Sequence, residues 1–254
     1  MLQAVHTVLR ERPTSDWLSA VERVLSGIRP TPLSPLLDRE RLYAGEMLAR
    51  HFSEAKRVRQ GLNAPEFDST GDYGIVRSIL GQELDEDRMR LGRYAENRSA
   101  LIAVYASFGP ESDLDPFERS KGRSDPGQSD LVMIDLLTPS LQQCLRTRDR
   151  SELRHRAVRT MLELERYRLD HGEYPDTLPA AALSPVLRDP FSGRRFGYRR
   201  AESDNDGSGR GYVLWTVGLD GVDNGGAFDE DSWDQALMPW GFGKDMMLNS
   251  PRWW

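Results

Sequence analysis

The hydrophobic periodicity changes from three-to-four to two near Phe196, and this change constrains the fold more than any other feature of the chain. Before it, apolar residues occur every three or four positions, as in amphipathic helices. After it, Phe196 and Tyr198 alternate with less apolar residues, and residues 211–217 (GYVLWTV) form a buried-strand run. We therefore predict an α+β protein: an all-helical N-terminal region, residues 1–145, then a long helix plus a small antiparallel sheet, residues 146–254.

Three helices are predicted in the N-terminal region, over residues 15–28, 35–55 and 85–108, with Ser15 and Ser34 as N-caps of the first two. Their predicted inner faces are Trp17, Leu18, Val21, Val24, Leu25 and Ile28; Leu36, Tyr43, Ala44, Met47, Leu48, Phe52 and Ala55; and Leu91, Tyr94, Ala95, Leu101, Ile102, Tyr105 and Phe108. Residues 109–130, rich in Pro, Gly, Ser and charge, are predicted to be a mobile excursion.

The long helix of the second part is predicted to begin at Asp149, which forms a capping-box pattern with Glu152. Gly172 and Pro175 are predicted to end this helix. Residues 202–209 (ESDNDGSG) are similar to the start of an EF-hand loop, but Val213 stands where the bidentate Glu belongs, so we interpret them as a hairpin tip.

The charge balance argues against nucleic acid as a partner. The formal net charge is −6, although residues 146–168 carry eight arginines. Acids at i,i+4 spacing predict the ion pairs Glu152–Arg156 and Arg159–Glu163 on this helix. A solvated or domain-facing charged surface is therefore favoured over a phosphate-binding one.

Residues 216–231 (TVGLDGVDNGGAFDED) contain five carboxylates and four glycines but no Lys or Arg. Carboxylates that converge to about 5 Å repel each other by roughly 1 to 3 kcal/mol per pair at effective dielectrics of about 80 to 20. Two interpretations stay open: a glycine-rich turn with solvated acids, or a cation site.

An ordered series of turns in the second part resembles the globular domain of the major pseudopilin of bacterial type II secretion. The series is a helix, a His-Gly-x-Tyr-Pro turn, an Asp-Pro-aromatic-x-Gly turn, a Tyr strand and a Gly-x-Asp-Gly loop, over roughly residues 150 to 247. The matching positions are His171, Gly172, Tyr174, Pro175, Asp189, Pro190, Phe191, Gly193, Tyr198, Gly218, Asp220 and Gly221. Glycine suits the left-handed end of a helix, and Asp-Pro-Phe-Ser-Gly suits a tight turn.

This resemblance implies a calcium site in the acidic loop. Calcium binds six to eight oxygens from carboxylates, carbonyls and water. The resemblance assigns Asp220, Asp229 and Asp231 as ligands; Asp223, Asp245 and the carbonyl of Leu219 are further candidates in this chain. The role implied is structural.

The chain also departs from secretion pseudopilins. About 140 residues precede the long helix, and the arginines of that helix could not lie in a filament core. The chain is more similar to large uncharacterised bacterial envelope proteins, of the kind abundant in planctomycetes, that carry such a module. Filament assembly is therefore not expected.

No residues form a recognised catalytic pattern or a site for an organic cofactor. Cys144 and His155 are eleven residues apart, about 16 Å along a helix, which is too far for a dyad. His51 and Glu54 would make at most half of a metal site. The leading hypothesis is a non-enzymatic, envelope-associated structural or interaction protein, with an unknown envelope or secretion-related protein partner.

Two alternatives remain. One is a ligand- or partner-binding module that uses the aromatic tail (Trp233, Trp240, Trp253 and Trp254), and the other is an uncharacterised hydrolase. No run of residues is long and apolar enough to predict a membrane span. The expected location is the bacterial cell envelope, outside the cytoplasm if an anchor lies upstream, and otherwise the cytoplasm.

Overall fold

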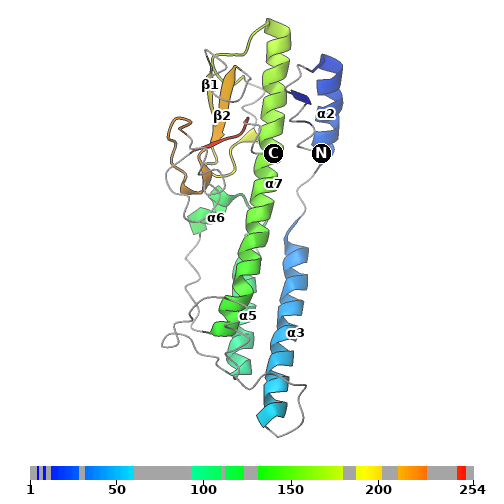
Figure 1. Cartoon of the computed structure of the whole chain (residues 1–254), viewed down its shortest axis with the longest axis vertical. Coiled ribbons are helices and arrows are strands. Elements are labelled where there is room, and N and C mark those ends of the chain that lie inside the picture. The colour runs from blue at the N-terminus through cyan, green and yellow to red at the C-terminus, as the bar shows by residue number, and fades with distance from the viewer. Residues whose placement is uncertain are drawn as a thin grey trace. The chain divides into compact units, whose positions relative to one another are not determined.

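The computed structural model shows an α+β protein that combines helices with a three-stranded antiparallel sheet, and this confirms the predicted fold class (Figure 1). The residues described are 5, 8–9, 13–28, 32–59, 93–109, 112–122, 131–179, 187–201, 211–227 and 245–249, without the side chains of 51–59 and of some residues in 120–142. The elements are α2 (Ser15–Gly27), α3 (Ser34–Arg59), α5 (Tyr94–Phe108), α6 (Pro116–Gly122), α7 (Val132–His171), β1 (Gly197–Arg200), β2 (Tyr212–Thr216), η4 (Gly218–Asp220) and β3 (Met246–Met247).

The chain forms two compact units. The first contains residues 1–31, 114–122 and 146–254, and the second contains residues 32–113 and 123–145. The chain passes from the second unit to the first between residues 145 and 146, where the sequence analysis placed its boundary. The units are not the two consecutive regions predicted from the sequence. Residues 1–31 belong to the first unit, because Leu18 and Leu25 of α2 share an apolar core with α7 and the sheet.

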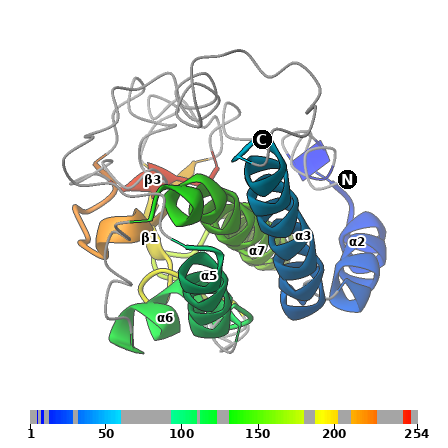
Figure 2. The same cartoon turned by 90° about the horizontal axis from the view of Figure 1, so that it is seen from below.

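The second unit is helical and consists of α3, α5 and the first part of α7, which Figure 2 shows side by side. Its buried apolar residues are Leu33, Leu37, Ala44, Leu48, Leu101, Tyr105, Phe108, Leu131, Ile134, Leu141 and Leu145. Ala44 and Leu48 lie on the buried face of α3 as predicted. Leu36, Tyr43 and Met47 do not, because their side chains are 42%, 59% and 44% exposed.

The predicted inner face of α3 was too wide: Leu36, Tyr43 and Met47 lie one residue, about 100° around the helix axis, from the buried Leu37, Ala44 and Leu48. The true inner face runs through Leu37, which the periodicity did not separate from Leu36. On α5, Leu101, Tyr105 and Phe108 are buried as predicted, whereas Tyr94 and Ile102 are exposed. Residues 85–92 and the side chains of Phe52 and Ala55 lie outside the described part of the chain.

Helix α2 starts one residue earlier than its predicted cap implied. Thr14 is the N-cap, and its Oγ1 accepts a hydrogen bond from the Trp17 amide at 3.4 Å. Leu18 and Leu25 are fully buried against the first unit's core, but Val24 and Ile28 are exposed and do not belong to the inner face. The buried face is therefore narrower than the sequence predicted.

Helix α7 is continuous from Val132, so the capping box predicted at Asp149 and Glu152 is wrong. Both residues lie in the helix interior, where their carboxylates pair with arginines instead of backbone amides. The predicted end is confirmed, because α7 stops at His171 and Gly172 adopts a left-handed φ of 85°.

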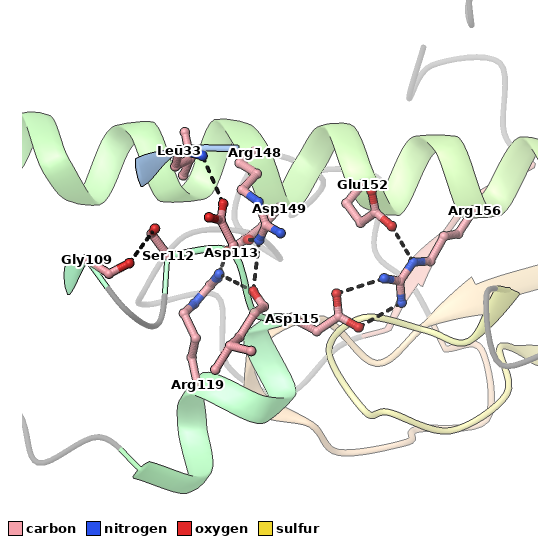
Figure 3. A network of polar contacts seen from close by, with 11 residues as sticks. Leu33, Gly109, Ser112, Asp113, Asp115, Arg119, Arg148, Asp149, Glu152 and Arg156 are labelled. Carbon is pink, nitrogen blue, oxygen red and sulfur yellow. Dashed lines mark hydrogen bonds and ion pairs between the residues drawn. The ribbon is translucent and has the colours of Figure 1, made fainter. Parts of the chain in front are cut away.

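Residues 114–122 include α6 and are attached to α7 by a network of ion pairs, shown in Figure 3. Arg119 and Asp149, which are 7% and 6% exposed, form a direct ion pair. Arg156 contacts both oxygens of Asp115 at 2.8 and 2.9 Å and Glu152 Oε1 at 2.7 Å. The prediction that residues 109–130 are a mobile excursion is therefore wrong for residues 114–122, because ion pairs attach them to α7.

The sheet has the order β1-β2-β3, and β2 is buried along its whole length. Asn249 continues the pairing beyond β3 with its side chain: Oδ1 accepts from the Leu214 amide at 3.0 Å, and Nδ2 donates to the Tyr212 carbonyl at 2.7 Å. This contact fixes the returning chain beside β2. It thereby places Asp245, at the start of the return, next to the acidic loop.

Candidate cation site

The acidic loop follows β2 directly and turns through η4. Gly218, Gly221, Gly225 and Gly226 all have φ between 68° and 76°, the left-handed region that glycine adopts without strain. The loop therefore owes its path to its glycines. It presents the acids of residues 218–227 beside the end of the central strand.

The Trp215 side chain of β2 packs against this loop. A Cβ on Gly197 of β1 would lie 1.9 Å from the Trp215 ring, and one on Gly226 would lie 2.9 Å from it. The indole Nε1 donates to Asp223 Oδ1 at 3.0 Å, and the Gly225 amide donates to the same oxygen at 2.9 Å. The two glycines thus allow the indole to pack between strand and loop, and the indole holds Asp223 in place.

Asp245 lies at the base of the loop and is 2% exposed. Its Oδ2 accepts hydrogen bonds from the Asn224 and Gly226 amides at 2.9 and 2.7 Å. Its Oδ1 is buried and has no hydrogen-bond partner among the described residues. Burying a carboxylate oxygen without a partner is costly.

The surroundings of Asp245 change the pKa of its carboxyl group. Burial raises its pKa, the hydrogen bonds from Gly226 and Asn224 lower it, and the charges of Asp223 and Asp220 raise it again, so that the net shift is upward. The side chains of Asp220 and Asp223 thus lie close enough to Asp245 to repel it. The charged groups that shift the pKa of Asp245 are two acids, and no Lys or Arg is among them.

The predicted calcium ligands are placed as follows. Asp220, Asp223 and Asp245 belong to the same loop and its base, although Asp220 Oδ1 also accepts a hydrogen bond from the Val222 amide at 3.0 Å. Leu219 is exposed, and Asp229 and Asp231 lie outside the described residues. Within the described part, no three His, Cys, Asp or Glu side chains are grouped closely enough to hold a metal ion.

These residues fit calcium in chemistry but form only part of a site. All the candidate donors are oxygens, which calcium prefers, and one of them is orphaned in the protein interior. Asp223 is exposed, and within the described part both of its hydrogen bonds fall on Oδ1, which leaves Oδ2 for an ion. The remaining ligands would come from water, from carbonyls or from Asp229 and Asp231.

Asp189 has a structural role that the sequence analysis missed. It is 1% exposed and accepts four hydrogen bonds. The donors are the Phe191 amide (3.0 Å), Ser192 Oγ (3.1 Å), Thr216 Oγ1 (2.8 Å) and the Val217 amide (3.3 Å). The bonds within the turn could be inferred from Asp-Pro-Phe-Ser, but the bonds to the end of β2 could not. Asp189 therefore anchors the strand from which the acidic loop departs.

The arginines of α7 within the described residues form a paired surface in part as predicted. The Glu152–Arg156 pair is confirmed at 2.7 Å. The Arg159–Glu163 pair is wrong, because Arg159 binds Glu22 of α2 at 2.8 Å. Glu163 instead accepts from Arg166 at 2.6 Å. The packing of α2 on this side of α7 supplies the competing carboxylate.

The described histidines make backbone contacts. His155 Nε2 lies 3.0 Å from the Leu25 carbonyl, which joins α7 to α2. His171 stacks on Tyr167 at 3.9 Å, and its Nδ1 lies 2.9 Å from the Tyr167 carbonyl in the last turn of α7. The His51 and Glu54 side chains and the four C-terminal tryptophans lie outside the described residues.

Comparison with protein families, with curated proteins and with solved structures found no match to the chain. The resemblance to pseudopilins therefore stays a prediction that depends on the order of the turns. In the part of the chain that is described, no helix has both the length and the apolar composition needed to span a membrane.

Proposed function

We propose that this chain is a non-enzymatic, envelope-associated interaction protein whose residues 146–254 form a pseudopilin-like module with a calcium-stapled loop. The order of elements supports the proposal. Helix α7 ends at Gly172, the Asp189 turn follows, and β1 and β2 lead into the glycine-rich acidic loop. This is the order that the family pattern prescribes.

The observation that carries the proposal is the buried and unpartnered Oδ1 of Asp245. A proton or a positive charge at this oxygen would stabilise the carboxylate. Residues 216–231 contain no Lys or Arg to supply that charge. A divalent cation bound to Asp245 Oδ1, with further oxygens from water, from carbonyls or from other acids of the loop, would satisfy the orphaned oxygen and reduce the repulsion from Asp220 and Asp223.

Such a cation would have a structural effect. Asp245 already joins the loop to the chain that returns through β3, because its Oδ2 binds the Asn224 and Gly226 amides. An ion on Oδ1 would add a second link between the same two segments. The loop would then be fixed on the sheet and could present a constant surface to a partner.

Thermal melting in calcium, magnesium and EDTA tests the calcium part of the proposal. A ligand at a hundred times its dissociation constant stabilises the folded state by about 2.7 kcal/mol. We therefore expect calcium to raise Tm by about 5 to 10 °C for a chain of this size, with a smaller effect of magnesium.

Asp220→Ala should reduce this calcium response, and Asp16→Ala, which removes an acid from the first turn of α2, should leave it intact. An unchanged Tm of the wild-type protein in saturating calcium would contradict the calcium staple.

The genomic sequence upstream of Met1 tests the envelope assignment. A signal segment or an apolar anchor encoded in frame would support it. A translation start at Met1 itself would contradict it and favour the cytoplasm.

A further inference from the structure

Strand β1 has one edge that is not paired within the described residues. Its partner is β2, in the register Gly197↔Trp215 to Arg200↔Tyr212. The Ala201 amide donates to the Gly211 carbonyl at 2.9 Å, which identifies the residues of β1 that bond β2. Because hydrogen bonding alternates along an antiparallel strand, Gly197 and Arg199 face β2, and the amides and carbonyls of Tyr198 and Arg200 point outward.

The side chains around this edge are basic. Residues 194–200 (RRFGYRR) contain four arginines and no acid, in a chain of net charge −6. Arg194, Arg195 and Arg199 are exposed and make no ion pair within the described residues. This charge disfavours pairing with the β1 edge of a second copy, since like charges would then lie opposite each other. It favours a strand that carries acidic residues.

The edge is also held in its extended form before any partner binds. Tyr198 Oη donates to the Pro175 carbonyl at 2.6 Å, and the Tyr198 ring packs near Tyr212. Arg200 pairs with Glu173 at 2.6 Å. A strand that is already ordered loses little conformational entropy on binding, and this increases affinity.

We propose that the β1 edge binds an acidic, extended segment of a partner protein as an additional strand of the sheet. Main-chain hydrogen bonds to Tyr198 and Arg200 would give affinity, and Asp or Glu side chains facing Arg194, Arg195 and Arg199 would give specificity. This inference rests on the interaction function proposed above and names the chemistry of the partner.

Binding of synthetic peptides to the whole chain tests the proposal. The probe is a ten-residue peptide of alternating Val and Glu. One comparison peptide replaces Glu by Lys, and another carries N-methyl groups at every residue so that neither edge has N–H donors. Calorimetry gives affinity, and hydrogen exchange followed by NMR reports on the Tyr198 and Arg200 amides. We expect the Val/Glu peptide alone to bind and to slow exchange at both amides.

Charge-reversal variants locate the binding surface. Arg195→Glu combined with Arg199→Glu should weaken binding of the Val/Glu peptide at least tenfold. Arg23→Glu is the matched control, because Arg23 is an exposed arginine of α2, and it should leave the affinity unchanged.

Three results would overturn the proposal: no binding of the Val/Glu peptide, equal binding of the N-methylated peptide, or a dimer of the chain that the double reversal dissociates. Calcium-dependent melting and the sequence upstream of Met1 are independent of these results. A failure at β1 is thus distinguishable from a failure of the proposed function.

Discussion

Acidic side chains are held in two opposite ways within the first unit. Between α6 and α7, the carboxylates of Asp115, Asp149 and Glu152 each face a guanidinium, from Arg119 or Arg156. In the loop after β2, Asp223 and Asp245 accept hydrogen bonds from neutral N–H groups only, as far as the described residues show. The first cluster is neutralised by arginines, whereas no Lys or Arg of the described residues forms an ion pair with Asp223 or Asp245.

Two acid-rich stretches of this chain thus differ in the partners of their carboxylates. Residues 111–118 and 216–231 are both rich in acid, but in the first stretch Asp115 pairs with Arg156 of α7. This ion pair attaches the first stretch to α7. Removing Arg119 from the first cluster should lower the free energy of unfolding. Removing the charge of Asp245 from the second cluster should not lower it in the absence of a cation.

The largest effect is expected for Arg119→Met, which leaves Asp149 buried without its main partner. Breaking a buried pair in this way typically costs about 3 to 5 kcal/mol. Urea denaturation should show a loss of unfolding free energy in this range. The double variant Arg119→Met with Asp149→Leu should recover most of it. A loss below about 1 kcal/mol for the single variant would mean that the network does not hold α6.

The next effect is expected for Asp189→Ala, which tests a buried acid held by neutral donors. The substitution leaves four donors without their acceptor, and each unsatisfied buried group costs about 1 to 3 kcal/mol. We expect a loss of at least about 2 kcal/mol in urea denaturation, partly restored in Asp189→Asn. Equal stability of all three proteins would show that Asp189 does not anchor β2.

A smaller effect is expected from pH, measured as the difference in stability between the wild type and Asp245→Asn in EDTA. The pKa of Asp245 is raised in the folded state by burial and by Asp223 and Asp220. The stability that its neutral form contributes is therefore present below the unfolded pKa of about 3.9 and is lost as pH rises through the folded pKa.

Wild type should thus lose stability relative to Asp245→Asn as the pH rises above about 4. Urea denaturation at several pH values measures this difference, and Asp16→Asn serves as the control. A difference that stays constant, or that changes in favour of the wild type, would contradict a raised pKa at Asp245.

The smallest effect is expected for Arg41→Ala. Arg41 and Asp38 form an exposed i,i+3 pair at 3.7 Å on α3. Exposed helix pairs contribute about 0.2 to 0.5 kcal/mol, so the change should be close to the error of urea denaturation. A loss of about 2 kcal/mol would show that exposure does not separate weak from strong ion pairs in this protein.

Local patterns predicted much of the fold. The continuous apolar run at residues 211–217 identified β2, and Gly172 identified the end of α7, because both depend on nearby residues. The start of α7 could not be predicted from Asp149 and Glu152. Their acid pattern suits a capping box and an arginine partner equally well, and tertiary packing chooses between them.

The candidate site was predictable in part for the same reason. The acids and glycines of residues 216–227 are visible in the sequence. The register that places Gly197 against Trp215, and the Asn249 contacts that carry Asp245 to the loop, join residues far apart in the chain. A single sequence contains no signal for such long-range pairings.

The most direct test of the account is the stability of Asp245→Asn relative to the wild type, measured by urea denaturation at pH 7 in EDTA and again in saturating calcium. In EDTA the variant should be at least as stable, because Asn keeps an acceptor for the two amides and removes a buried charge. In calcium the order should reverse, since only the wild type binds the ion tightly. A variant that is less stable by the same amount in both conditions would contradict a cation site at Asp245.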